Sequence, residues 1–169
     1  MFSEDVSAVD EIVATITIPP NVRIVRFSVS HILLMDLDPW QQSLIESYPD
    51  YLPHLEARTQ TGAGYTYLIE GKPSLSFGIV PVWQGVADAW MIRDNVVSQY
   101  AVSVCRGARL FFDLVPVTLQ LHRLQFTVAK ANITAIKFAE FLKFRREGLL
   151  REYTPNHEDY IAMARIYEE

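Results

Sequence analysis

The spacing of hydrophobic positions predicts alternating strands and helices through the first 92 residues. Apolar and polar residues alternate from Ile12 to Ile18, which favours a strand, and Pro19-Pro20 would end it because proline cannot donate to a ladder. Gly71 and Pro73 suit a tight hairpin turn. The expected elements are strands at 12–18, 23–29, 65–70, 75–83 and 86–92, and helices at 36–48 and 50–60.

The second half of the chain continues with helices placed between single strands. The stretch 98–114 carries one apolar stripe at three- and four-residue spacing, and a further helix of the same period starts after Asn132, a good N-cap. A buried strand is expected at 122–128, and two further strands are expected at 144–153 and 159–167. From residue 23 onward the order is therefore β-α-α-β-β-β-α-β-α-β-β.

Residues 1–22 are predicted to form a strand-like arm in front of one domain at 23–169. Two roles are open for this arm. It could cover an edge of its own sheet, or residues 1–20 could add a strand to another protein subunit.

Composition narrows the class of partner. Half of the 169 residues are hydrophobic and 21% are charged, as in an ordinary globular domain. The net charge of −5 gives no reason to expect nucleic acid or an anionic membrane as partner. The single cysteine cannot form an intrachain disulfide, the acidic start does not fit a signal peptide, and no apolar run approaches a membrane span. A cytoplasmic protein is expected, in a host cell or as part of a virion.

Together with the order of elements, the sequence of residues 122–166 resembles the GNAT (Gcn5-related N-acetyltransferase) superfamily. This stretch reads "HRLQFTVAKANITAIKFAEFLKFRREGLLREYTPNHEDYIAMARI". That resemblance implies an α/β (α+β) fold: a mixed, twisted sheet of about six to seven strands, helices on both faces, and a splay between the fourth and fifth strands. Acetyl-CoA would lie in the splay, with its pantetheine arm on the fourth strand and its pyrophosphate on the next helix N-terminus. The cofactor-binding positions implied are Met91, Ile92, Arg93, Ser98, Asn132 and Lys137.

Three positions depart from the family's pattern. The pyrophosphate turn usually contains closely spaced glycines, but the matching stretch "RDNVVSQYAVSVCRG" has none before Gly107. The family's general-acid tyrosine corresponds to Ala139, and its helix-ending glycine corresponds to Lys143. These departures predict a weakened cofactor site.

Candidates for chemistry each have a structural alternative. Asp88, on the presumed fourth strand, is the candidate general base that would deprotonate an ammonium. Asn132 is either a cofactor contact or only a helix cap, and Lys137 either meets phosphate or stays solvated. Cys105 falls on an apolar stripe and is expected in the core. The four histidines show no ligand spacing, so no metal site is expected.

Two functions remain open from sequence. The Gly-x-x-Pro-x-Trp-x-Gly-Val pattern at residues 78–86 resembles small GNAT-like proteins of tailed bacteriophages, which implies a non-catalytic structural or protein-binding component of a virion or other assembly. The alternative is an active N-acetyltransferase that uses acetyl-CoA and a primary amine. The missing glycine turn favours the first.

Overall fold

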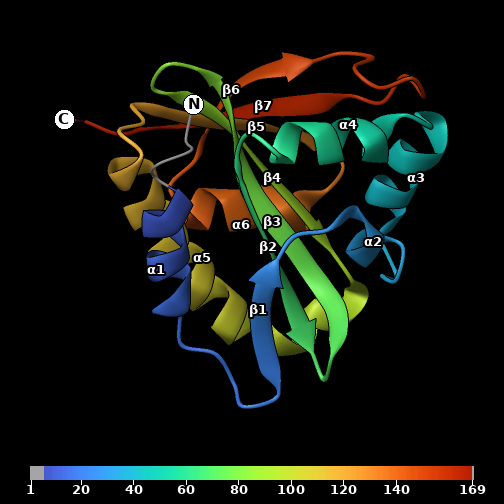
Figure 1. Cartoon of the computed structure of the whole chain (residues 1–169). Helices are drawn as coiled ribbons and strands as arrows, with labels where there is room; N and C mark the ends of the chain where they lie inside the picture. The colour runs from blue at the N-terminus through green and yellow to red at the C-terminus, as the bar shows by residue number, and fades with distance from the viewer. Residues whose placement is uncertain (1–5, 169) are drawn as a thin grey trace.

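A computed structural model describes residues 6–168 and shows one mixed sheet with helices on both faces (Figure 1). Within these residues the sheet has seven strands in the order β1-β2-β3-β4-β5-β7-β6. No helix in this range is long and apolar enough to cross a membrane. The strands are β1 (Val22–Arg26), β2 (Ala63–Ile69), β3 (Lys72–Trp83), β4 (Val86–Arg93), β5 (Arg123–Ala129), β6 (Arg145–Leu150) and β7 (Tyr160–Ile166). The helices are α1 (Val6–Ala14), α2 (Val29–Ile32), α3 (Pro39–Ser47), α4 (Tyr51–Thr59), the 3₁₀ helix η1 (Asn95–Tyr100), α5 (Ala101–Thr118) and α6 (Ile133–Phe141).

The sheet opens between its fourth and fifth strands. β1 to β4 form an antiparallel meander, and β5, β7 and β6 form a second antiparallel set. The two sets are joined by β4 and β5, which run parallel but pair only where residues 86–88 meet residues 123–125. Beyond that point the strands separate. The expected fold, including helices on both faces and the splay, is confirmed.

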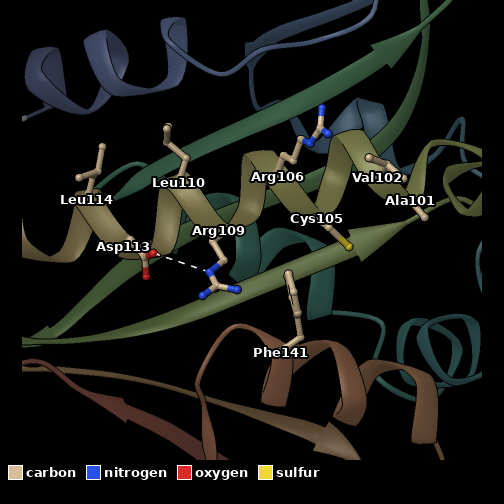
Figure 2. Close-up of a pocket in the computed structure, with 9 residues that line it drawn as sticks. All are labelled: Ala101, Val102, Cys105, Arg106, Arg109, Leu110, Asp113, Leu114 and Phe141. Atoms are coloured by element: carbon tan, nitrogen blue, oxygen red, sulfur yellow. Dashed lines mark ion pairs between the residues drawn. The ribbon is translucent and has the colours of Figure 1, made fainter.

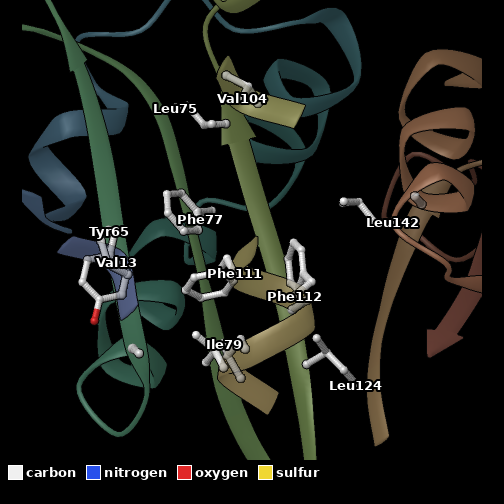
Figure 3. Packing of buried hydrophobic residues seen from close by; sticks show 14 of the residues in the cluster. Val13, Tyr65, Leu75, Phe77, Ile79, Val104, Phe111, Phe112, Leu124 and Leu142 are labelled. Carbon is white, nitrogen blue, oxygen red and sulfur yellow. The ribbon is translucent and has the colours of Figure 1, made fainter. Parts of the chain in front are cut away.

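Alternation along the strands divides the interior into two cores. On one face, under α1, α5 and α6, Tyr65 and Phe77 both pack edge-on against Phe111, whose side chain is fully buried (Figure 3). On the other face a smaller cluster forms around Ile92 and Leu55, beneath α2 and α4. The splay lies between α5 and α6 on the first face and beside α3 on the second.

The strand expected at 12–18 is wrong. Residues 12–14 belong to the last turn of helix α1, and the chain turns after Ala14. Val9, Val13 and Ile16 are buried in the main core, at a spacing that fits a helix face, and this burial outweighs the local alternation. Asp10 accepts a hydrogen bond from the Tyr65 hydroxyl at 2.8 Å and pairs with Arg26. Helix α1 is therefore held against β1 and β2 by polar contacts and against α5 by apolar packing. The domain boundary at residue 22 stays a prediction.

The helix expected at 98–114 begins and ends later than its apolar stripe suggests. Residues 95–100 form η1, and α5 continues to Thr118 with Pro116 inside its last turn. Proline cannot donate to the Phe112 carbonyl four residues earlier, and this carbonyl instead accepts a hydrogen bond from the Tyr167 hydroxyl at 2.8 Å. Helix α2 is absent from the sequence-based expectation, since four residues carry too little periodicity to be seen in sequence.

Lys143 ends α6 in the left-handed conformation that normally calls for glycine. Its φ is +70°, its N–H donates to the Glu140 carbonyl, and the next N–H, of Phe144, donates to the Ala139 carbonyl. These two bonds are the Schellman arrangement. A side chain in this backbone conformation is strained by about 1 kcal/mol relative to glycine.

Replacing Lys143 by glycine should therefore stabilise the protein, by about 0.5–1 kcal/mol after the loss of the exposed Lys143–Asp113 ion pair. Urea unfolding would measure the gain. Lys143→Ala is the matched control, because it removes the same ion pair but keeps a Cβ at positive φ. Equal stability of the glycine and alanine variants would contradict the strain argument.

Candidate cofactor cleft

The free edge of β4 is the first part of the candidate site. Backbone groups of successive strand residues point to opposite edges, so residues 89, 91 and 93 direct theirs to the side that β5 has left. Among described residues, the pairing with β5 stops at Asp88. Two of the freed groups are covered by Gln41 of α3, whose side-chain N–H donates to the Met91 carbonyl (3.0 Å) and whose oxygen accepts from the Arg93 N–H (3.1 Å).

A groove on the outer side of α5 is the second part. It has a volume of about 750 Å³, and one residue of α6, Phe141, closes its far wall (Figure 2). Figure 2 shows Cys105 and Arg109 projecting toward α6, with the Arg109 guanidinium 5.2 Å from the Phe141 ring centroid. The other lining residues are Ala101, Val102, Arg106, Leu110, Asp113 and Leu114. The groove is mainly apolar with two guanidinium groups, which suits an apolar chain that ends in an anion.

Asp113 fixes the end of this groove. It accepts a hydrogen bond from Arg165 of β7 at 2.5 Å and is paired with Lys143 at 3.4 Å and Arg109 at 3.9 Å. Burial pushes the pKa of Asp113 upward, but the hydrogen bond and charge of Arg165, with those of Lys143, outweigh it and hold the pKa below its ordinary value. The carboxylate therefore stays ionised and ties α5 to β7 across the splay.

The position where the family places pyrophosphate has no free N–H groups among its described leading amides. The N–H of Asn95 donates to the Asp36 carbonyl, and the N–H groups of Val96 and Val97 donate to the side chain and carbonyl of Asp94. Because η1 runs on into α5, these are the leading amides of the whole helical stretch. Two carboxylates, Asp36 and Asp94, lie here as well, so an anion is disfavoured.

Gly107, the first glycine after β4, has a packing role. A Cβ built there would lie 2.4 Å from the Tyr67 hydroxyl and 2.9 Å from the Ile16 side chain. The glycine therefore lets α5 approach β2 and the segment after α1, and it lies inside the helix away from any phosphate turn.

Asp88, the candidate base, lies at the apex of the splay, where β4 and β5 begin to separate. Its side chain is on the side of the sheet that α4 covers. It is the last β4 residue paired with β5, and its carboxylate receives a 2.6 Å hydrogen bond from Arg58 and a 3.1 Å bond from Gln125. The carboxylate is thus held as an ion-pair partner. As a general base, the Asp88 carboxylate would accept a proton either with the Arg58 ion pair intact or after the Arg58 side chain has moved away.

The structure brings only part of the predicted cofactor set together. Met91 and Arg93 present their backbone at the open edge, whereas the Ile92 side chain is buried in the opposite core. Ser98 lies in η1 and bonds the Asn95 carbonyl. The remaining two are on α6: Asn132 caps the helix by accepting from the Ala135 N–H at 3.1 Å, and Lys137 is exposed. The cap is confirmed, and contact with a cofactor stays a prediction.

Four residues of the site are not singled out by sequence reasoning. Arg106, Arg109 and Phe141 could have been found, because they fall on the polar side of a predicted helix and at the end of another. Gln41 carries no signal, since its partners are about fifty residues away in sequence. Cys105, expected in the core, instead lines the groove and is partly exposed. Within residues 6–168 no three His, Cys, Asp or Glu side chains gather as metal ligands.

The sequence matches no protein-family model and no curated protein sequence. Solved structures do match in three dimensions. Ard1 from Thermoplasma volcanium superposes with a TM-score of 0.69 at 17% identity, covering 88% of this chain and 99% of that one. The ribosomal L7/L12 alpha-N-protein acetyltransferase RimL, in complex with coenzyme A, gives 0.64 at 13% identity, covering 89% and 97%. An acetyltransferase (GNAT family) from Bacillus anthracis gives 0.64 at 13% identity, covering 88% and 96%.

These likenesses cover 88–89% of this chain. At such identities they establish the fold, and they leave the tailed-phage resemblance without support. The protein therefore has the fold of the GNAT acetyltransferases.

Proposed function

We propose that the protein is an N-acetyltransferase that transfers the acetyl group of acetyl-CoA to an amine. The observation that carries the proposal is the parting of β4 and β5, which leaves a strand edge open between α5 and α6. An open edge of backbone N–H and C=O groups binds an extended, amide-containing chain as if it were another strand. Among the proteins that share the fold, one was solved with coenzyme A.

The residues fit this ligand in part. Backbone groups at 89–93 would hold the amides of the pantetheine arm, and the apolar wall formed by Val102, Leu110 and Phe141 would cover it. The leading amides of the η1–α5 stretch are occupied, so phosphate would instead meet Arg109 and Arg106. We infer a phosphate position displaced toward the α5 groove.

The chemistry needs a neutral amine at the apex of the splay. Acetyl-CoA supplies an acetyl group activated as a thioester. Asp88 lies at the apex and would take the proton from the incoming ammonium, and Arg58 would keep the carboxylate in place. Ala139 supplies no acid for the departing thiolate, so this proton must come from water or another group.

Titration calorimetry with acetyl-CoA and with desulfo-CoA tests the cofactor site. We expect micromolar binding, together with slower labelling of Cys105, the single cysteine, by a thiol reagent when desulfo-CoA is bound. Arg109→Glu should weaken binding at least tenfold. The control is Arg23→Glu, an exposed reversal on β1 outside the groove. No heat at millimolar ligand and unchanged Cys105 labelling would rule the proposal out.

A second candidate function is favoured by the hydrogen bonds that already occupy the β4 edge and the start of η1. Gln41 covers the β4 edge, and Asp94 and Asp36 occupy the helix start, as in a domain that has lost its cofactor. In that case the protein would be a non-catalytic structural or protein-binding component, of the kind expected from the resemblance to tailed-phage proteins. Absence of binding in the titration would favour this candidate, and affinity capture of other subunits would then test it.

A further inference from the structure

Gln41 occupies the open edge of β4 in the manner of a missing strand. One residue of a parallel neighbour would donate to one β4 carbonyl and accept from the N–H two residues further on. The Gln41 amide makes this pair of bonds, to the carbonyl of Met91 and from the N–H of Arg93. The side chain thus replaces β5 just where β5 has turned away.

Helix α3, which carries Gln41, is held by polar contacts on two sides and by Ile45, which is partly buried against the smaller core cluster. Its nine residues include none that is buried. On the β4 side its N-cap, Asp38, accepts from the Gln41 N–H at 2.9 Å and lies 3.9 Å from the Arg93 guanidinium. On the β7 side, Asn156 in the turn before β7 donates to the Ser43 hydroxyl at 3.0 Å. The helix therefore bridges the two halves of the split sheet without a fully buried side chain to keep it there.

Asp38 is itself poorly satisfied in this arrangement. Its side chain is 4% exposed, and one of its carboxylate oxygens has no hydrogen-bond partner among the described residues. A buried carboxylate without a full set of partners favours conformations that expose it. Exposing this oxygen to water would therefore offset part of the cost of moving α3 from its closed position.

We propose that α3 is a gate over the splay and that Gln41 is its latch, so a ligand that bonds β4 at Met91 and Arg93 must first displace the Gln41 amide. This inference rests on the proposed function, because the ligand class it names is the amide-bearing arm of an acyl-CoA. It goes beyond that function by assigning the competing residue in this chain. The latch weakens binding because only the molecules with a free β4 edge can bind the ligand. The apparent dissociation constant is the intrinsic one divided by the fraction of such molecules.

The test compares Gln41→Ala with Gln42→Ala. Gln42 is the next residue of the same helix and has the same side chain, but it is exposed and its side chain bonds Glu46 within α3. Two measurements are made on each purified chain: amide hydrogen exchange at Arg93 without ligand, and calorimetric titration with desulfo-CoA. Thermal unfolding of each variant confirms that it is folded.

With the latch removed, the Arg93 amide should exchange at least tenfold faster, and desulfo-CoA should bind roughly tenfold more tightly than to the wild type. Gln42→Ala should change neither. Equal binding by wild type and Gln41→Ala would overturn the gate and leave the cofactor site intact. Failure of both chains to bind at millimolar ligand would overturn the proposed function and the gate together. Unchanged Arg93 exchange in Gln41→Ala would show that the latch bonds do not form in solution.

Discussion

Replacing Val9 by aspartate should lower the free energy of unfolding by about 4 kcal/mol or more. Val9 has no exposed surface, and it lies in the main core where α1 meets α5. The substitution removes a buried apolar side chain and places an unpaired carboxylate in its position. Since small domains have about 5–15 kcal/mol of stability in total, this loss would remove a large share of it and move the unfolding midpoint to much lower urea. Urea unfolding followed by circular dichroism measures the change.

Ala14→Asp is the matched control for Val9→Asp. It places the same charge on the same helix at an exposed position, so we expect it to cost no more than about 0.5 kcal/mol. If Val9→Asp were as mild as the control, residues 1–22 would be the detachable arm that the sequence suggests. A partner that binds helix α1 would have to use the side of the helix that α5 does not cover.

Replacing Gly107 by alanine should cost about 2 kcal/mol, and replacing it by valine about 3 kcal/mol. Alanine is ordinarily favoured over glycine in a helix by about 1 kcal/mol. Whether Gly107→Ala raises or lowers the free energy of unfolding therefore separates helix propensity from packing. The loss is expected because the new Cβ would meet the Tyr67 hydroxyl at 2.4 Å. Tyr67 cannot easily move away, because it is 3% exposed and its ring packs against the ring of Phe77.

Gly148→Ala supplies the comparison. A Cβ at Gly148 meets no atom within 4 Å and its φ is ordinary, so we expect a change within about 0.5 kcal/mol of zero. Stabilisation by Gly107→Ala, as helix propensity alone predicts, would contradict the packing role assigned to this glycine. In that case the approach of α5 to β2 would be looser than the structure indicates.

The candidate site shows where sequence reasoning stops. The family resemblance points to β4 and the following helix, and the missing glycines are visible in the amino-acid sequence alone. The sequence does not reveal that Asp94 and Asp36 take the leading amides, or that Gln41 takes the Met91 and Arg93 groups. Each of these contacts joins residues far apart in the chain or depends on hydrogen-bond geometry, which has no periodic signature.

Apart from the short helices α2 and η1, the sequence by itself determined the order of the strands and helices from residue 23 onward, because period-two and period-3.6 patterns record which side of each element is buried. The family resemblance also indicated the end of α6, where Lys143 stands in a position that normally takes glycine. Only the tertiary structure decided that residues 6–14 are a helix, since burial against α5 outweighed a local alternation that favoured a strand. Likewise, only the tertiary structure decided that the splay is bridged by α3, because the parting of β4 from β5 is what leaves backbone groups free for Gln41.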